Sequence, residues 1–295
     1  MSKRTWALIA ATLVSLIYGV SFTIAKDVMP MYVKPYGFII LRVLGAAILF
    51  WAVSFLGPRE KIQREDFPRI IAAAFFGVAF NMLTFFKGLS LTSPISSAVI
   101  MVTTPIIVLI LSSIMMKEKM KSRKIIGILL GLFGTGFLIL YGKSIGTATN
   151  AMLGNFLVFV NAISYGFYLI VVKKLMDKYN AFTFVKWIYA FGLLMVLPFS
   201  WSEYQEIQWA IIPTPILWEI GFVVVFTTFF TYLLNLISMR ELKPTTVAVF
   251  IYLQPLFATV FAIGLGKDDL SLVKIGSAIL IFSGVYLVTQ KVKSN

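Results

Sequence analysis

Residues 94–118 read PISSAVIMVTTPIIVLILSSIMMKE, and residues 244–268 read PTTVAVFIYLQPLFATVFAIGLGKD. Each stretch runs for 23 residues from a proline without a charge and ends in a lysine followed by an acidic residue, Glu118 or Asp268. An apolar run of about 20 residues is long enough to cross a bilayer as an α-helix. Because backbone amides in hydrocarbon must be satisfied within the chain, we predict a membrane-spanning helix in each stretch.

The two stretches belong to a longer internal repeat. A shift of 150 residues superimposes five similar pairs without a gap: Pro94 on Pro244, Ala98 on Ala248, Pro105 on Pro255, Glu118 on Asp268 and Gly134 on Gly284. A shift of 147 lays Tyr18-Gly19 on Tyr165-Gly166. We therefore predict two copies of one unit, residues 1–146 and residues 147–295.

The rest of the chain has the same character. It is 59% hydrophobic and 13% charged with a mean hydropathy of +0.92, whereas about a quarter of the residues in soluble domains are charged. Apolar runs of spanning length fall at roughly 5–26, 34–56, 67–90, 94–116, 123–142, 151–174, 182–201, 213–238, 244–266 and 271–290. The sequence therefore predicts an all-α integral membrane protein of ten spans, five in each copy.

Basic residues are distributed unequally between the two sides of such a bundle. With ten spans, 18 of the 26 Lys and Arg residues fall on the side of both termini and five on the other. The positive-inside rule then predicts cytoplasmic termini in the cell (inner) membrane. Because five is an odd number, the second copy enters the membrane from the opposite side, so the repeats are inverted. Inverted repeats with proline-interrupted helices are typical of transporters that work by alternating access.

Composition excludes several other functions. The chain has no Cys and no His, which rules out thiolate nucleophiles, His-ligated metals and His-based acid–base catalysis. The net charge of +14 comes from short clusters between apolar runs, so we expect no nucleic-acid partner. We predict no enzyme activity, no cofactor and no metal; the partners are a small-molecule substrate and the bilayer, and the sequence leaves open whether the chain forms a homodimer.

Several short motifs resemble one transporter family. They are Tyr18-Gly19-Val20-Ser21-Phe22, Leu41-Arg42, Gly88-Leu89 with the run from Pro94 through Pro105 to Glu118, the run from Pro244 through Gln254-Pro255, Gly276, and Gly284-Val285-Tyr286-Leu287. In order and spacing they resemble the EamA family of the drug/metabolite transporter superfamily over nearly the whole chain. The resemblance implies ten spans, cytoplasmic termini and transport of small metabolites, often export of amino acids.

The chain departs from that family at three places. Tyr18 stands where Trp is usual, Asp268-Asp269 replaces the Glu of the second repeat, and Lys87 occupies a position where a small residue is common.

Three charges lie inside spans away from the cytoplasmic end: Arg42, Lys87 and Glu219. Burying a charge costs at least about 2.5–3.5 kcal/mol, so each is expected to have a partner or water. Arg42 is predicted to hold a substrate carboxylate or to close an outer gate by pairing with Glu219. Lys87 is predicted to bind substrate or to reach the outer headgroups.

Uncharged polar residues form two further faces. Asn161, Tyr165 and Tyr168 share one face of the sixth span with Ser164, and Tyr232 and Asn235 share one face of the eighth with Thr228. With Asn81 and Gln254 they complete the predicted substrate site, although interhelical hydrogen bonding is the alternative for each. Pro105 and Pro255 lie at mid-span and, with Tyr18 and Glu219, are predicted to act in gating or as hinges.

These observations predict a secondary transporter of small metabolites, most simply an exporter of amino acids or related amphipathic carboxylates. Since no Asp or Glu lies near a span centre, facilitated movement or exchange is favoured over proton coupling. The alternative is a sugar-phosphate or nucleotide-sugar exchanger, with a channel or a membrane-embedded enzyme ranked below it.

Overall fold

The computed structural model describes residues 2–29, 31–58, 60–92, 97, 100–119, 121–140, 150–264 and 271–290, with no account of the side chains of Phe22, Thr23, Lys26, Leu138, Ile139, Leu140 and Ala262. Every regular element in these ranges is helical, and none is a strand. The predicted boundary between residues 146 and 147, and Pro94, Asp268 and Asp269, lie outside the described residues.

The first half contains α1 (Lys3–Val28), α2 (Pro35–Val53), α3 (Phe67–Ala74) with η3 (Phe75–Ala79) and α4 (Phe80–Leu91), α6 (Thr104–Met116) and α7 (Ser122–Leu140). The second half contains α8 (Ala151–Met176), α9 (Ala181–Gln205), α10 (Thr214–Phe222) with η5 (Val223–Phe230) and α11 (Thr231–Glu241), α12 (Pro244–Val249) with η6 (Phe250–Tyr252) and α13 (Leu253–Gly264), and α14 (Leu272–Thr289). Short 3₁₀ turns, η1 (Ser54–Leu56), η2 (Arg64–Asp66) and η4 (Trp209–Ile211), lie between spans.

Each of the ten predicted apolar runs coincides with a described helix or a rod of consecutive helices. Eight of these are at least 18 residues long and apolar enough to cross a membrane. The described part of the fourth run is the shorter apolar helix α6, and the fifth run is the 19-residue α7. The prediction of an all-α membrane fold is confirmed.

The contacts between counterpart helices demonstrate the inversion. At one end of the α2–α9 pair, the N–H of Gly37 donates to Glu203 near the end of α9 (3.2 Å). At the other end, Lys186 near the start of α9 lies against Ser54, which follows α2 (3.5 Å). The two helices, second in their respective repeats, therefore run in opposite directions.

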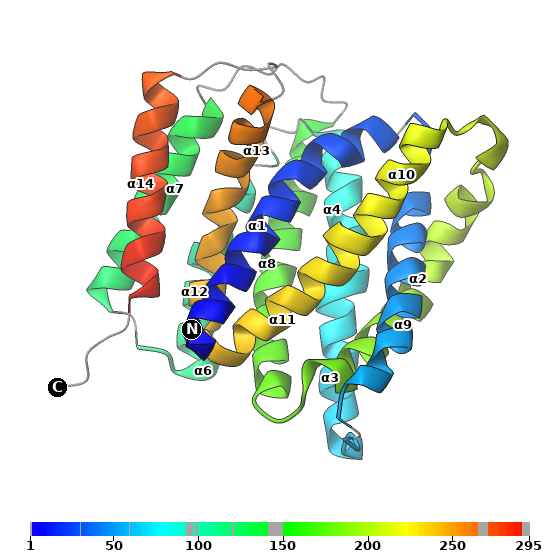
Figure 1. Cartoon of the computed structure of the whole chain (residues 1–295), viewed down its shortest axis with the longest axis horizontal. Helices are drawn as coiled ribbons and strands as arrows, with labels where there is room; N and C mark the ends of the chain where they lie inside the picture. The colour runs from blue at the N-terminus through cyan, green and yellow to red at the C-terminus, as the bar shows by residue number, and fades with distance from the viewer. Residues whose placement is uncertain are drawn as a thin grey trace.

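Both ends of the described chain lie at one end of the bundle. Arg4, at the start of α1, donates to the carbonyl of Thr289, the last residue of α14. Figure 1 shows the same arrangement, with the N-terminus beside the lower ends of α12 and α14. An even number of crossings separates the two residues, as ten spans require.

The remaining contacts repeat under exchange of the two halves. α4 packs on α8 as its counterpart α11 packs on α1, and α6 packs on α8 as α13 packs on α1. Two pairs, α2 with α9 and α7 with α14, consist of counterparts that pack on each other. This pattern is what a pseudo-two-fold axis in the membrane plane produces.

Glycines permit the close approach of α7 and α14. A Cβ built on Gly127 would lie 2.8 Å from the carbonyl oxygen of Gly284, and one on Gly134 would lie 3.0 Å from that of Ser277. The small-residue spacing in this part of the sequence therefore serves helix packing.

Candidate functional site

Two counterpart helices lose regular α geometry in the middle of the bundle. The third span contains the π-helical η3 and the eighth contains the π-helical η5, and the 150-residue shift carries residues 75–79 onto 225–229, inside η5. A π-turn displaces a backbone carbonyl from its usual partner and is frequent at functional sites. Here these carbonyls accept side-chain bonds: that of Phe76 from Ser164 (2.8 Å) and that of Gly77 from Tyr232 (2.5 Å).

Arg42 lies against this region from α2. Its side chain is buried, with 8% of the residue exposed, and its Nε donates to the hydroxyl of Thr228 in η5 (3.0 Å). Its guanidinium lies over the ring of Phe86, 5.1 Å from the centroid. None of the described acidic residues forms an ion pair with Arg42. The buried cation is held by a hydroxyl and a ring and is not neutralised by a carboxylate.

Tyrosines from three helices lie near the guanidinium. The ionisable groups near enough to act on Arg42 are Tyr18, Tyr189 and Tyr232. The ring of Tyr232 lies 5.1 Å from that of Tyr189 and 6.0 Å from that of Tyr168, measured between centroids. Arg42 therefore sits beside an aromatic wall whose hydroxyls add polar atoms to an apolar interior.

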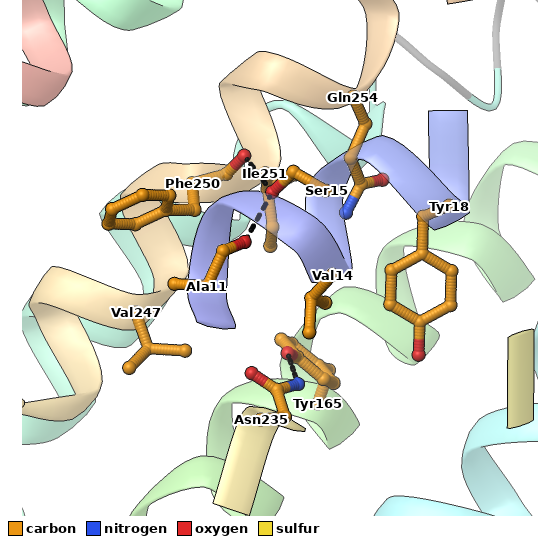
Figure 2. A pocket seen from close by; sticks show the side chains of 10 residues that line it. All are labelled: Ala11, Val14, Ser15, Tyr18, Tyr165, Asn235, Val247, Phe250, Ile251 and Gln254. Atoms are coloured by element: carbon orange, nitrogen blue, oxygen red, sulfur yellow. Dashed lines mark hydrogen bonds between the residues drawn. The ribbon is translucent and has the colours of Figure 1, made fainter. Parts of the chain in front are cut away.

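A small cleft adjoins this wall, between α1, α8, α11 and the α12–α13 rod (Figure 2). Four predicted site residues line it: Tyr18, Tyr165, Asn235 and Gln254. The amide of Asn235 donates to the hydroxyl of Tyr165 (3.0 Å), the contact drawn at the lower centre of Figure 2. Thr231 connects the cleft to η5, because its hydroxyl donates to the carbonyl of Thr227 (2.5 Å) and lies 3.3 Å from the hydroxyl of Tyr18.

The cleft is too small for a metabolite in this conformation. Its volume is about 10 Å³, which is enough for one water molecule. Ser15 helps to close it, since its hydroxyl donates across the interface to the carbonyl of Phe250 in η6 (2.8 Å). The structure therefore represents a closed conformation, and a substrate needs α1 and the α12–α13 rod to separate.

The two mid-span prolines follow interruptions of their helices. Ahead of Pro255, residues 250–252 form the 3₁₀ turn η6. Ahead of Pro105, the N–H of Thr103 bonds the carbonyl of Ile100 (3.0 Å), a 3₁₀-type contact at the equivalent place. The helical break accompanies both prolines, while their action as hinges stays a prediction.

Asn161 makes an interhelical hydrogen bond, which is the alternative to a role in substrate binding. Its amide donates to the backbone carbonyl of Asn81 (2.8 Å) and so connects α8 to α4. These two predicted site residues join neighbouring helices and are not among those that line the cleft.

Two charged residues predicted for the site, Lys87 and Glu219, lie apart from Arg42 and the cleft. Lys87 is exposed on α4, so the structure does not bring it to Arg42. Glu219 on α10 has a buried Oε2 without a hydrogen-bond partner among the described residues, and it forms no pair with Arg42. The predicted Arg42–Glu219 gate contact is absent from this closed conformation.

Three residues beside Arg42 or the cleft were not predicted as site residues from the sequence: Tyr189, Phe86 and Thr231. Tyr189 is fully buried on α9 in an apolar run. A polar hydroxyl inside a span is the signal that singles out Tyr165 and Tyr168, and applied to every span it finds Tyr189 also. Phe86 carries no such signal, because a phenylalanine in a span is ordinary.

A second polar cluster closes the end of the bundle that carries the termini. Glu118 is buried and pairs with Lys124, accepts from the hydroxyl of Thr245 (3.0 Å), and lies 3.8 Å from Lys243. Glu118 and Lys124 belong to the first repeat, whereas Lys243 and Thr245 open the ninth span in the second. We call these four residues the Glu118 latch.

A separate ion pair joins loops at the same end. Asp66 accepts from Lys178 (2.5 Å) and from the hydroxyl of Tyr179 (2.7 Å). The hydrogen bond to Asp66 and its negative charge raise the pKa of Lys178. This pair connects the loop before α3 to the loop before α9.

Comparison with known proteins agrees with this architecture. Residues 5–140 and residues 152–290 each match the EamA-like transporter family, so the match covers both repeats. The chain belongs to the EamA-like transporter family. Its place within the drug/metabolite transporter superfamily, inferred above from short motifs, is confirmed.

Full-length relatives of this EamA-like chain carry transporter names without a stated substrate. An uncharacterized transporter of Archaeoglobus fulgidus is 26% identical, covering 98% of this chain and 99% of its own. The uncharacterized transporter YoaV of Bacillus subtilis is 25% identical and covers 94% of both chains. A crystal structure with a TM-score of 0.77 covers 97% of this chain and 96% of its own at 16% identity, which shows a shared fold.

Proposed function

We propose that this EamA-like transporter exports small amphipathic carboxylates, amino acids among them, across the inner membrane by alternating access, with both termini in the cytoplasm. The observation that carries the proposal is the position of Arg42. A buried guanidinium with no carboxylate partner among the described residues is costly unless an anion completes it. Nε is engaged by Thr228, and the fork formed by the two remaining nitrogens is suited to a carboxylate.

The surroundings of Arg42 favour an organic acid with an apolar part. Phe86 and the rings of Tyr168, Tyr189 and Tyr232 supply an apolar wall. Asn235, Gln254 and Tyr18 lie in the adjoining cleft and offer donors and acceptors to a second polar group of the substrate.

The sugar-phosphate or nucleotide-sugar alternative fits less well. A phosphate monoester carries about two negative charges at neutral pH. Of the three basic residues that the sequence assigns to neither side of the membrane, Arg42 is buried beside the tyrosines, Lys87 is exposed, and Lys186 lies near the start of α9 against Trp51. One guanidinium matches one carboxylate better than a dianion.

The test is transport by the purified protein in proteoliposomes. Radiolabelled leucine, phenylalanine and benzoate serve as carboxylate probes, and leucinamide and phenylalaninamide serve as competitors that lack the carboxylate. Arg42→Gln is expected to weaken the affinity for transported carboxylates by about 10- to 100-fold, the loss of a charge-assisted contact. Lys87→Gln is the matched control and is expected to leave affinity unchanged. Equal affinity in the parent and in Arg42→Gln for every transported carboxylate would contradict the proposal.

A further inference from the structure

Lys186 is a charged group inside a span that the transport site does not use. It is the sixth residue of α9, about 7.5 Å along the helix axis from its start. Its ammonium lies 4.9 Å from the centroid of the Trp51 ring and 3.5 Å from the hydroxyl of Ser54. An ammonium has three donors, and these contacts leave hydrogen-bonding capacity unused.

The nearby acidic residues are engaged by other groups. Asp66 binds Lys178 and Arg69, and Glu65 lies 3.4 Å from Lys178. Glu60 accepts from the N–H of Asn180 and from the hydroxyl of Thr183 (2.7 Å). Among the described residues, no carboxylate forms an ion pair with Lys186.

The surface around the ammonium is aromatic and faces outward. Trp187 packs edge-on against Trp51 (5.3 Å between centroids) and against Phe67 (5.7 Å). Trp51 is 40% exposed, and Phe55 and Leu56 beyond it are more than 80% exposed. In a membrane such residues contact lipid, with Trp at the level of the headgroups. The ammonium therefore opens toward lipid at the end of the bundle that carries the termini.

We infer that Lys186 and the indole edges of Trp51 and Trp187 bind the headgroup phosphate of a net-anionic phospholipid, with Ser54 positioning the ammonium. The ammonium is the donor to the phosphate oxygens. The Ser54 hydroxyl donates to the carbonyl of Trp51 (2.8 Å) and accepts from the ammonium, which it positions, while the exposed Phe55 and Leu56 contact the acyl chains. Basic pockets between spans on the cytoplasmic side are typical places for such headgroups. A zwitterionic lipid is bound less well, because its own choline already compensates its phosphate.

The experiment uses brominated lipids, which quench tryptophan on contact. A variant with Trp6, Trp201, Trp209 and Trp218 changed to Phe retains Trp51 and Trp187 as its reporters; the four replaced residues are all at least 47% exposed. It is reconstituted into vesicles of brominated phosphatidylglycerol mixed with plain phosphatidylcholine, and into vesicles with the bromine on the phosphatidylcholine. The expected preference for phosphatidylglycerol at these tryptophans is about fivefold.

Lys186→Gln is expected to abolish the preference, Lys186→Arg to retain it, and Lys87→Gln, which removes an exposed lysine from a different span, to leave it unchanged. Equal quenching by the two lipids in the parent would overturn the inference even if Lys186→Gln did not fold. Loss of the preference when inorganic phosphate is added in excess would assign the site to free phosphate and overturn the lipid assignment. Transport is not measured, so the result is independent of the proposed substrate.

Discussion

Thr228 gives Arg42 its orientation. Its hydroxyl accepts from Nε of Arg42 and donates to the carbonyl of Val223 (2.9 Å), five residues earlier in the π-helical η5. In a regular α-helix the carbonyl four residues earlier would be the one within reach. The π-turn thus sets the direction of the hydroxyl and, through it, the direction of the guanidinium.

Removing that hydroxyl is expected to weaken both the fold and the site. Thr228→Val keeps the shape of the side chain but leaves Nε of Arg42 without its acceptor, at a cost of about 1.5–3 kcal/mol. We expect a lower melting temperature in detergent and weaker affinity for carboxylate probes. Thr228→Ser restores the hydroxyl and is expected to recover most of both losses. Equal behaviour of the Val and Ser variants would show that the hydroxyl does not position Arg42.

Single residues also mark the limit of what this sequence predicts. In the sequence, Arg42 and Lys87 cannot be told apart, because each is a cation within an apolar run. In the structure, Arg42 is buried and Lys87 is exposed. The apolar residues of these spans encircle the helix, so periodicity does not separate the lipid face from the interior. The orientation of each charge is decided by tertiary packing.

At the scale of helices, the contact between α7 and α14 depends on the absence of side chains. A Cβ on Gly284 would lie 2.7 Å from the backbone nitrogen of Gly131. Gly276, on the same helix, has no atoms within 4 Å of the place a Cβ would occupy. The two glycines therefore form a matched pair for mutation.

Gly284→Ala is expected to destabilise the protein by about 1–3 kcal/mol, the usual cost of overpacking. Gly276→Ala is expected to be neutral or slightly stabilising, because alanine favours a helix more than glycine does. Thermal unfolding of both variants in detergent makes the comparison. Equal melting temperatures would contradict the close contact of α7 and α14.

The Glu118 latch joins elements of different repeats at the end of the bundle that carries the termini. Glu118→Gln retains the size of the side chain but removes the charge that pairs with Lys124 and Lys243. Because those contacts cross from the first repeat to the start of the ninth span, their loss is expected to favour opening at that end. Val247 lines the cleft. In the Glu118→Gln background, a thiol introduced by Val247→Cys is expected to react faster with a thiol reagent applied from that side than it does with Glu118 intact. An unchanged rate would show that the latch does not hold this end closed.

At the scale of the molecule, the architecture was predictable and the interior was not. The matched pairs from Pro94/Pro244 to Gly134/Gly284 predict the duplication, and an odd number of spans per copy predicts the inversion that the Arg4–Thr289 and Gly37–Glu203 contacts bear out. The π-turns contain no proline that marks them in the sequence; η3 packs on α8 and α9 as η5 packs on α1 and α2, so they depend on contacts between distant segments. The sequence thus predicts four of the residues that line the cleft, Tyr18, Tyr165, Asn235 and Gln254. It does not predict that Thr228 is the hydrogen-bond partner of Arg42, which depends on the folded chain.

The same symmetry predicts that the cleft opens alternately to the two sides. The chain has no cysteine, so one introduced thiol can report access without background. Ala11 is 1% exposed, lines the cleft and differs from cysteine by one sulfur atom. Ala11→Cys is therefore the least disruptive probe of the closed site.

The decisive measurement is the rate at which a membrane-impermeant methanethiosulfonate reagent modifies Ala11→Cys in oriented vesicles, applied to one side at a time. Alternating access predicts reaction from both sides, with Glu118→Gln raising the rate from the side of the termini and lowering it from the other. Reaction from one side alone, or rates that rise together on both sides as in an open pore, would contradict alternating access.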